Sequence, residues 1–384
     1  MMEERKYKNQ YKIIATIILM VVIVLVSVAY YVLRADRLPK GSVVYIVPVY
    51  GQSLALGEET TLITDIDDYG DKTNHRVKSE FLNERIGYYA DKLWKQRFKS
   101  IFGIEHRHFE TSVFGLSECF VRQIPNKNVF LCTFPAGQGE TQISLLGKGT
   151  QPYQKLIDEI RMVYEKASAQ GAKVVMPAFC WMQGENDLVW NTKYDYAALL
   201  RKFRKDVEQD VKAITHQKQS VSCILYQTNS LTLTKEQMNP DNYQCRQIMI
   251  PEQQRQLIMN DKHFSASGPV YPYNVMRNYV HIDAYGQKQM GWLEGLTLYR
   301  LKHGEHFIGL QPLSAFRHQD TIIVKMNVPV PPLALDTITV AKAKHYGFSV
   351  VSQYNQDILR DVQIKGNLVY LICKMNSVGK VKVR

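Results

Sequence analysis

A serine, a histidine and two residues able to stabilise an oxyanion lie in four short motifs spread along the chain. Ser53 ends Gly-Gln-Ser directly after an apolar run, and a serine there, beside a turn glycine, is well placed as a nucleophile. His281 precedes a helical pattern and can take a proton from a serine hydroxyl. Gly115 and Gln183 offer N–H donors to a developing oxyanion. Each motif is common alone, but the ordered set indicates acyl transfer.

The elements expected around these motifs alternate between buried strands and amphipathic helices. Apolar runs predict strands at 43–49, 128–134, 173–179 and 221–227, and apolar stripes predict helices at 81–102, 153–170, 194–214 and 285–302. Such alternation predicts an α/β fold with a parallel sheet covered on both faces. Reactive groups in such sheets lie beyond the carboxyl ends of the strands, where three of the four motifs are expected.

The last part of the chain has a different pattern. After residue 304 the helical period ends, and short alternating or apolar runs are separated by proline and glycine. This pattern predicts a small antiparallel β domain, a sandwich, with no catalytic cluster. We therefore expect three regions: 1–40, 41–303 and 304–384.

The N-terminal region contains a candidate membrane span. Residues 13–33 carry no charge, and a helix of that length matches a hydrocarbon core about 30 Å thick. Four basic residues precede the span and three follow it, a weak positive-inside bias. A cleavable signal peptide is the alternative, because Ser27-Val28-Ala29 resembles a cleavage site. We expect a single-pass anchor with the catalytic domain outside the cytoplasm, in the periplasm or at the cell surface.

Charge and cysteine usage narrow the function classes. The net charge is +12, but 41 basic and 33 acidic residues are interspersed over 41–384, so we expect no nucleic-acid partner, which needs a clustered basic face. The six cysteines are scattered and show no metal-ligand spacing. We interpret them as buried core thiols, with a disulfide framework as the alternative.

The motifs taken together resemble the SGNH (GDSL-like) hydrolase superfamily, and more narrowly its sialate O-acetylesterase and acetylxylan esterase branch. The resemblance covers about residues 43–300. It rests on these segments: Gly-Gln-Ser, Phe-Gly-Leu-Ser-Glu, Ala-Gly-Gln-Gly-Glu-Thr at 136–141, Trp-Met-Gln-Gly-Glu-Asn-Asp at 181–187, and His-Ile-Asp-Ala-Tyr-Gly. The segment at 181–187 is the most specific.

The resemblance implies a three-layer α/β/α sandwich that hydrolyses ester-linked acyl groups, usually acetyl on a sugar, without a metal or cofactor. By position, Ser53 is then the nucleophile and His281 the general base. Gly115 and Gln183, with the backbone N–H of Ser53, form the oxyanion hole. The expected partner is an acetylated glycan.

Two positions depart from the family pattern. Asn278 stands three residues before His281, where the family has an aspartate, and Met182 replaces a common histidine. The enzyme then uses a Ser–His dyad, or another acid supplies the carboxylate. The acids considered are Glu185, Asp187 and Asp283. The departure at Asn278 keeps open a catalytically weak, glycan-binding SGNH domain, and a glycan O-transacetylase is a further alternative because both reactions use the same acyl-enzyme.

Overall fold

The computed structural model describes most of the chain. The described residues are 14–24, 38–65, 72, 76–77, 109–189, 194–228, 240–276, 280–338, 342–354, 356–374 and 379–383. The predicted helix at 81–102 and the side chain of Asn278 lie outside these residues.

Eight parallel strands form the centre of the molecule. Their bounds are β1 Val43–Ile46, β2 Val49–Gly51, β3 Val129–Cys132, β4 Pro135–Gly137, β5 Lys173–Val175, β6 Ala178–Met182, β7 Ser222–Gln227 and β8 Phe264–Pro269. They pair in the orders β3-β1-β5 and β4-β2-β6-β7-β8, and every pairing is parallel. The predicted parallel α/β sheet is confirmed.

In three places where the sequence predicts one strand, the structure has two short strands in succession, and the second of one pair, β4, lies just past its predicted run. The run at 43–49 is interrupted at Val47-Pro48, and the run at 173–179 at Met176-Pro177. Proline has no N–H to donate to a neighbouring strand, so the ladder breaks there. In the third place, β3 ends at Cys132 and β4 begins at Pro135. The second halves, β2, β4 and β6, form a separate short sheet with β7 and β8. The motif loops follow these second halves.

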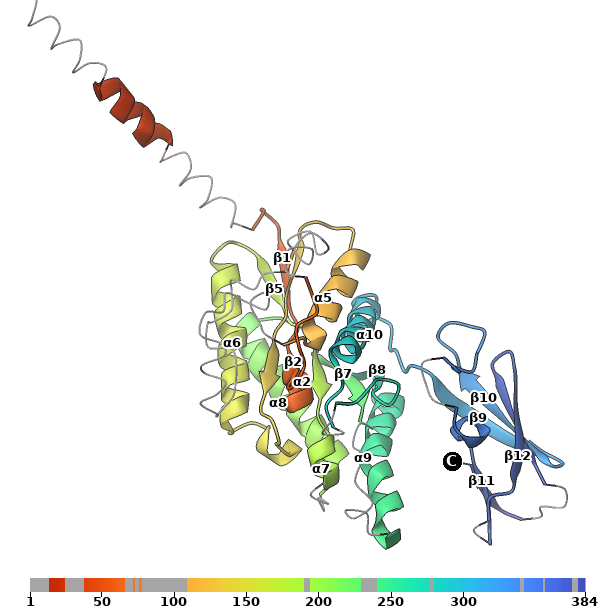
Figure 1. Ribbon diagram of the computed structural model, residues 1–384. Helices are drawn as coiled ribbons and strands as arrows, with labels where there is room; N and C mark the ends of the chain where they lie inside the picture. Colours follow the sequence, from red (N-terminus) through yellow and green to blue (C-terminus); the bar gives the residue numbers. More distant parts are fainter. Residues whose placement is uncertain are drawn as a thin grey trace, which may run out of the picture.

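Helices cover both faces of the sheet (Figure 1). Their bounds are α5 Ser112–Gln123, α6 Gln151–Ser168, α8 Tyr196–Thr215, α9 Pro240–Asn260 and α10 Ala284–Lys302, with short helices α2 Ser53–Leu56 and α7 Glu185–Val189. Successive side chains of a strand point to opposite faces. Accordingly Tyr50 and Trp181 pack with α6, α8 and α9, whereas Val49 and Met182 pack with α5 and α10.

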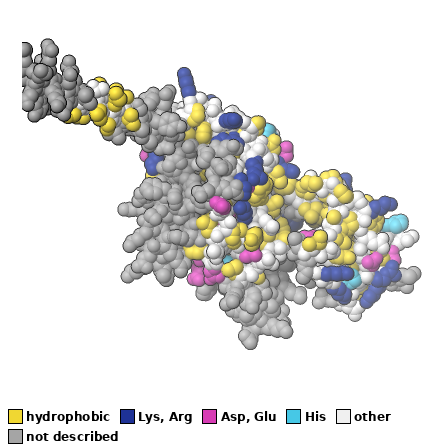
Figure 2. Space-filling view, turned by 45° about the horizontal axis from the view of Figure 1, so that its top comes forward, with side chains coloured by type: hydrophobic (Ala, Val, Ile, Leu, Met, Phe, Trp, Pro, Cys, Tyr) yellow, Lys and Arg dark blue, Asp and Glu magenta, His cyan; other side chains and the backbone are white. Residues whose placement is uncertain are grey.

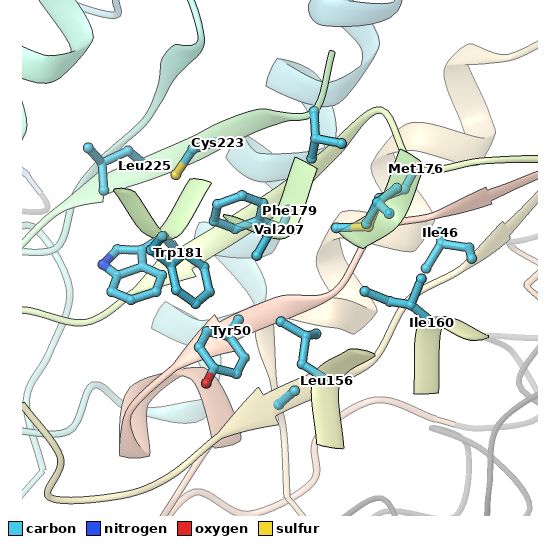
Figure 3. Packing of buried hydrophobic residues seen from close by; sticks show 14 of the residues in the cluster. Ile46, Tyr50, Leu156, Ile160, Met176, Phe179, Trp181, Val207, Cys223 and Leu225 are labelled. Atoms are coloured by element: carbon cyan, nitrogen blue, oxygen red, sulfur yellow. The ribbon is translucent and has the colours of Figure 1, made fainter. Parts of the chain in front are cut away.

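Aromatic packing holds the end of β2 against α8. The Tyr50 ring stacks on Phe203 with ring centroids 5.2 Å apart, and Trp181 lies 4.7 Å from the same ring. Figure 3 shows Tyr50, Trp181 and Phe179 in one buried cluster. Each such pair contributes about 0.5–1.5 kcal/mol beyond the area it buries. The strand that leads to Ser53 is therefore held firmly.

The C-terminal part is antiparallel, as predicted. Its strands are β9 Gln311–His318, β10 Thr321–Asn327, β11 Val350–Ser352, β12 Leu359–Lys365, β13 Leu368–Cys373 and β14 Val381–Val383. Four form a sheet in the order β12-β13-β10-β9, and β11 pairs with β14. These strands bury a core of their own, which includes Ile322, Val369 and Leu371. The boundaries 41–303 and 304–384 stay predictions.

Residues 14–24 of the predicted span form a helix, and the rest of 13–33 lies outside the described residues. Its apolar side chains, from Ile14 to Val24, are exposed, and Figure 2 shows them on the surface. Within the ranges that the structure describes, no helix combines the length and the apolar character needed to cross a membrane.

The cysteines whose side chains are described are all buried, and none forms a disulfide. They are Cys119, Cys132, Cys180, Cys223 and Cys373. Burial raises the pKa of the Cys180 and Cys223 thiols, which keeps both protonated. This agrees with the interpretation of core thiols for these five; the side chain of Cys245 lies outside the described residues.

Candidate active site

Ser53 is the first residue of α2, at the carboxyl end of β2, and is 3% exposed. A Cβ on Gly51 would lie 2.0 Å from the Met182 carbonyl oxygen, so glycine is needed for β2 to run this close to β6. The Gln52 N–H donates to the same carbonyl at 3.0 Å. The side chain of Gln52 does not cap α2. The first backbone N–H groups of a helix have no partner within it, so Ser53 presents a hydroxyl and an N–H together.

Three of the motifs meet around this turn. The Oε1 atom of Gln52 accepts weakly from the backbone N–H groups of Gly184 and Asn186, at 3.4 and 3.3 Å. The Gln138 N–H donates to the Gly51 carbonyl at 3.0 Å. The loops that follow β2, β4 and β6 therefore lie side by side, as expected for the carboxyl ends of parallel strands.

The oxyanion role expected for Gln183 stays a prediction, and the structure shows its side chain hydrogen-bonded within the site loops. Its Nε2 donates to the Thr141 carbonyl at 3.2 Å and to the Asp187 carboxylate. A side-chain amide carries two N–H donors, so both are directed away from an oxyanion. Asp187 also accepts from the Ile143 N–H at 3.0 Å and the Tyr194 hydroxyl at 2.6 Å. Gln183 and Asp187 thus tie the loops after β4 and β6 together.

The side chain of Glu185 is also held by hydrogen bonds, which come from residues at the end of β7 and just after it. Its buried carboxylate accepts from the Tyr226 hydroxyl at 2.5 Å and from the Thr228 hydroxyl. Burial and the Glu185 charge raise the pKa of Tyr226, which keeps that hydroxyl a donor. The structure therefore places two of the considered acids, Glu185 and Asp187, in loop-anchoring hydrogen bonds.

Gly115 lies inside α5 and not in a loop, and its expected oxyanion role stays a prediction. Thr111 is the N-cap of α5. The backbone N–H of Gly115 is therefore the first that can donate to the carbonyl four residues earlier, as in the rest of the helix. A Cβ there would lie 2.1 Å from the Lys288 carbonyl oxygen, and one on Gly291 would lie 1.9 Å from the Ser112 carbonyl oxygen. These glycines allow α5 and α10 to pack closely, so Gly115 serves packing.

The imidazole of His281 contacts Glu59, a residue that the sequence did not identify as a candidate. Its Nδ1 lies 3.3 Å from Oε2 of Glu59, and the imidazole is 11% exposed whereas the Glu59 side chain is 52% exposed. Glu59 follows the end of α2, so one short segment carries both Ser53 and this carboxylate. No spacing rule links Glu59 to a histidine so far along the chain.

Asp283, the third considered acid, caps α10. Its Oδ1 accepts from the Gly286 N–H at 2.7 Å, and its Oδ2 accepts from Nδ2 of Asn274 at 3.3 Å. A carboxylate at a helix N-terminus satisfies an orphan N–H and complements the helix dipole. Asp283 therefore fixes the start of the helix that follows His281.

The surroundings of the Ser53 turn are acidic. Burial, followed by the charges of Glu140 and Glu59, raises the pKa of Glu58 to about 8. The backbone N–H of Glu58 donates to the Ser53 carbonyl at 3.2 Å. In the described part of the chain no three His, Cys, Asp or Glu side chains are grouped to hold a metal ion, and metal-free hydrolysis stays an expectation.

Residues 65–292 match the family model described as "Carbohydrate esterase, sialic acid-specific acetylesterase", more than half of the chain. The chain belongs to this family. It is therefore a carbohydrate esterase, a carboxylic ester hydrolase of the O-acetyl type, and the resemblance drawn from the motifs is confirmed. The matched range includes Gln183 and His281 and begins after Ser53.

Solved structures are similar to this esterase in fold. A carbohydrate acetylesterase from Xanthomonas citri has a TM-score of 0.54 at 12% identity, over 86% of this chain and 72% of that chain. NanS has a TM-score of 0.43 at 13% identity, over 69% and 99%. A protein from Arabidopsis thaliana has a TM-score of 0.41 at 13% identity, over 67% and 97%. No curated protein matches the chain.

Proposed function

We propose that this esterase removes O-acetyl groups from a carbohydrate through an acetyl-enzyme on Ser53, with His281 as general base. The observation that carries this proposal is the meeting of two distant segments. Glu59, at the end of the Ser53 segment, contacts His281 at 3.3 Å, and Gln287, shortly after His281, donates to the Leu54 carbonyl at 2.8 Å. Nucleophile and base belong to segments that these contacts hold together.

The proposed reaction has two steps. The Ser53 hydroxyl attacks the acetyl carbonyl carbon while an imidazole nitrogen of His281 accepts its proton. Because Nδ1 faces Glu59, we assign Nε2 as that nitrogen. The tetrahedral intermediate collapses, and the sugar oxygen leaves with the proton from His281. Water, deprotonated by His281, then attacks the acetyl-enzyme; the bond to Ser53 Oγ breaks, His281 returns the proton to that oxygen, and acetate is released.

For the oxyanion we propose two backbone N–H donors, one of which, that of Ser53, was expected from the sequence. The backbone N–H of Ser53 remains a candidate, because it lies at the first position of α2. For the second donor we propose the backbone of Gly139 in place of Gly115. Gly139 follows Gln138, whose N–H already contacts the Gly51 carbonyl. Removing one oxyanion donor typically lowers the rate about 10²–10³-fold.

We further propose that residues 13–33 anchor the chain in a membrane with the catalytic domain outside the cytoplasm. This proposal is supported by the uncharged run and by the exposed apolar side chains of helix 14–24. An acetylated glycan of the cell surface or periplasm would then be the substrate. The family description favours O-acetylated sialic acid.

The experiment is acetate release from an aryl acetate and from O-acetylated sialic acid by the full-length chain in detergent. We expect Ser53→Ala to abolish turnover and His281→Ala to lower it at least 10³-fold. Ser168→Ala, at the far end of α6, is the matched control and should retain wild-type activity. Turnover that persists in Ser53→Ala would contradict the mechanism. A folded wild type that binds glycan but releases no acetate would favour the glycan-binding alternative.

A further inference from the structure

We propose that Glu59 is the positioning residue that orients His281, in place of the aspartate that the family has at position 278. This inference rests on the proposed Ser53–His281 function. It starts from the contact between Glu59 Oε2 and His281 Nδ1 at 3.3 Å. The family pattern places the acid on the histidine's own segment, whereas here it comes from the segment of the nucleophile.

The alternative acids are held elsewhere. Glu185 accepts from the Tyr226 and Thr228 hydroxyls. Asp187 accepts from the Gln183 amide, the Ile143 N–H and the Tyr194 hydroxyl. Asp283 caps α10. Glu59, in contrast, contacts the imidazole of His281.

The backbone around Glu59 makes a sharp turn, and the Glu59 side chain contacts His281 from this turn. Gly57 ends α2 in the left-handed region at φ 68°, and a Cβ there would lie 2.2 Å from the Glu110 carbonyl oxygen. Glu59 itself has φ 64°, which is uncommon for a residue other than glycine. Such backbone outliers persist where the surrounding structure holds them, and they cluster at active sites.

Glu110 supplies that surrounding structure. Its buried carboxylate accepts from the Ile63 N–H at 3.0 Å, and from the Thr64 N–H and hydroxyl at 2.9 and 2.7 Å. Its backbone carbonyl accepts from the Thr60 hydroxyl at 2.8 Å. The chain that follows Glu59 is therefore fixed to Glu110.

The chemical consequence concerns the imidazole tautomer. A carboxylate that accepts from Nδ1–H keeps the proton on that nitrogen and leaves the Nε2 lone pair for the serine hydroxyl. It also stabilises the imidazolium that forms during attack. In the serine-protease template the loss of this carboxylate lowers kcat about 10⁴-fold. Glu59 is half exposed, so solvent screens its charge, and we expect a smaller loss.

The test compares three variants of the full-length chain on an aryl acetate at pH 7, with kcat and KM measured separately. We expect Glu59→Gln to lower kcat about 10- to 100-fold with KM little changed, and Glu59→Asp to recover part of the rate. Glu58→Gln is the matched control. Because the pKa of Glu58 is raised to about 8, its carboxyl is mostly protonated at pH 7, and the amide alters the charge little. Melting temperatures identify any variant that fails to fold.

Asn278→Asp supplies a second, independent measurement. This substitution places a carboxylate at the family position, so we expect it to restore activity to a Glu59→Gln chain. A Glu59→Gln variant as fast as wild type would overturn the inference. So would equal losses in Glu58→Gln and Glu59→Gln. If Ser53→Ala is inactive and Glu59→Gln is fully active, the proposed function stands and the role of Glu59 is rejected. If Ser53→Ala is active, the proposed function itself is rejected.

Discussion

Gln287 donates from Nε2 to the backbone carbonyl of Leu54 at 2.8 Å, across the gap between the first turn of α10 and the short helix that begins at Ser53. The Gln287 side chain is buried. A buried hydrogen bond between two segments far apart in sequence fixes their relative position more than a surface contact does. The bond therefore couples the fold of α10 to the geometry of the proposed active site.

We expect Gln287→Met to impair catalysis more than stability. Methionine keeps a similar length but cannot donate, and the loss of one such bond costs about 1 kcal/mol. The Leu54 carbonyl retains its acceptance from the Gly57 N–H at 3.3 Å. The measurements are kcat on an aryl acetate and the free energy of unfolding in urea. Gln256→Met, on an exposed position of α9, is the control. Equal activity in both variants would show that the bond plays no part in positioning.

Asp187→Asn should destabilise the chain and lower its activity together. The variant amide would present N–H groups to donors, because Asp187 accepts from Gln183, Ile143 and Tyr194. Unmatched buried donors cost about 1–3 kcal/mol each. Thermal denaturation and acetate release measure the two effects. Asp158→Asn, at an exposed position of α6, controls for the chemical change. A stable, fully active Asp187→Asn would refute the anchoring role.

Gly115→Ala tests whether this glycine serves packing. Alanine favours a helix by about 1 kcal/mol over glycine, so an uncrowded site would gain stability. Here the added methyl would lie 2.1 Å from the Lys288 carbonyl oxygen, and overpacking costs about 1–3 kcal/mol. We expect net destabilisation by urea unfolding. Gly147→Ala, where a Cβ would meet nothing within 4 Å, should leave stability unchanged. A more stable Gly115→Ala would contradict the close packing of α5 and α10.

Glu294 makes stability depend on pH. It lies in α10 at 1% exposure, and burial raises its pKa to about 8 against a hydrogen bond with Ser112 that lowers it. A carboxyl with a raised native pKa stabilises fully below its unfolded pKa of about 4.5. That contribution is lost as the pH rises toward about 8, by up to about 1.4 kcal/mol per pH unit.

Glu294→Gln removes this dependence. We expect the variant and the wild type to have similar free energies of unfolding near pH 4.5, and the variant to become the more stable chain as the pH approaches 8. Glu58, whose pKa is also raised, is present in both the variant and the wild type, so it contributes equally to the pH dependence of their stability. Urea unfolding at the two pH values measures the difference, with the exposed Glu165→Gln as control. A difference that does not grow with pH would contradict a protonated Glu294.

Elements with a clear apolar period were predicted well. The helices expected at 153–170, 194–214 and 285–302 are α6, α8 and α10, each within two residues at both ends. The buried stripes of α6 and α8 are specified locally, because residues three and four apart share a helix face, whereas in α10 the expected stripe residue Leu293 is exposed. The C-terminal β region as a whole was predicted for the same reason, since alternation specifies a half-buried strand.

Elements whose stability comes from neighbours were missed. Helix α5 contains Gly115 and two serines, which favour a helix less than alanine or leucine, and α10 packs closely along it. Strand β8 reads Phe-Ser-Ala-Ser-Gly-Pro and has little strand preference of its own. Its pairing with β7 supplies the hydrogen bonds.

The motif residues show the same division. The types and order of Ser53, Gln183 and His281 are written in short stretches of chain, so the family could be recognised without a fold, and the roles of these residues stay predictions. The carboxylate that faces His281 could not be recognised in this way. Glu59 reaches the imidazole because of the turn at Gly57 and the hydrogen bonds to Glu110. Local sequence specifies which groups a loop offers. Contacts between segments remote in sequence specify which of those groups meet, since each depends on backbone positions that the whole sheet and both helix layers hold.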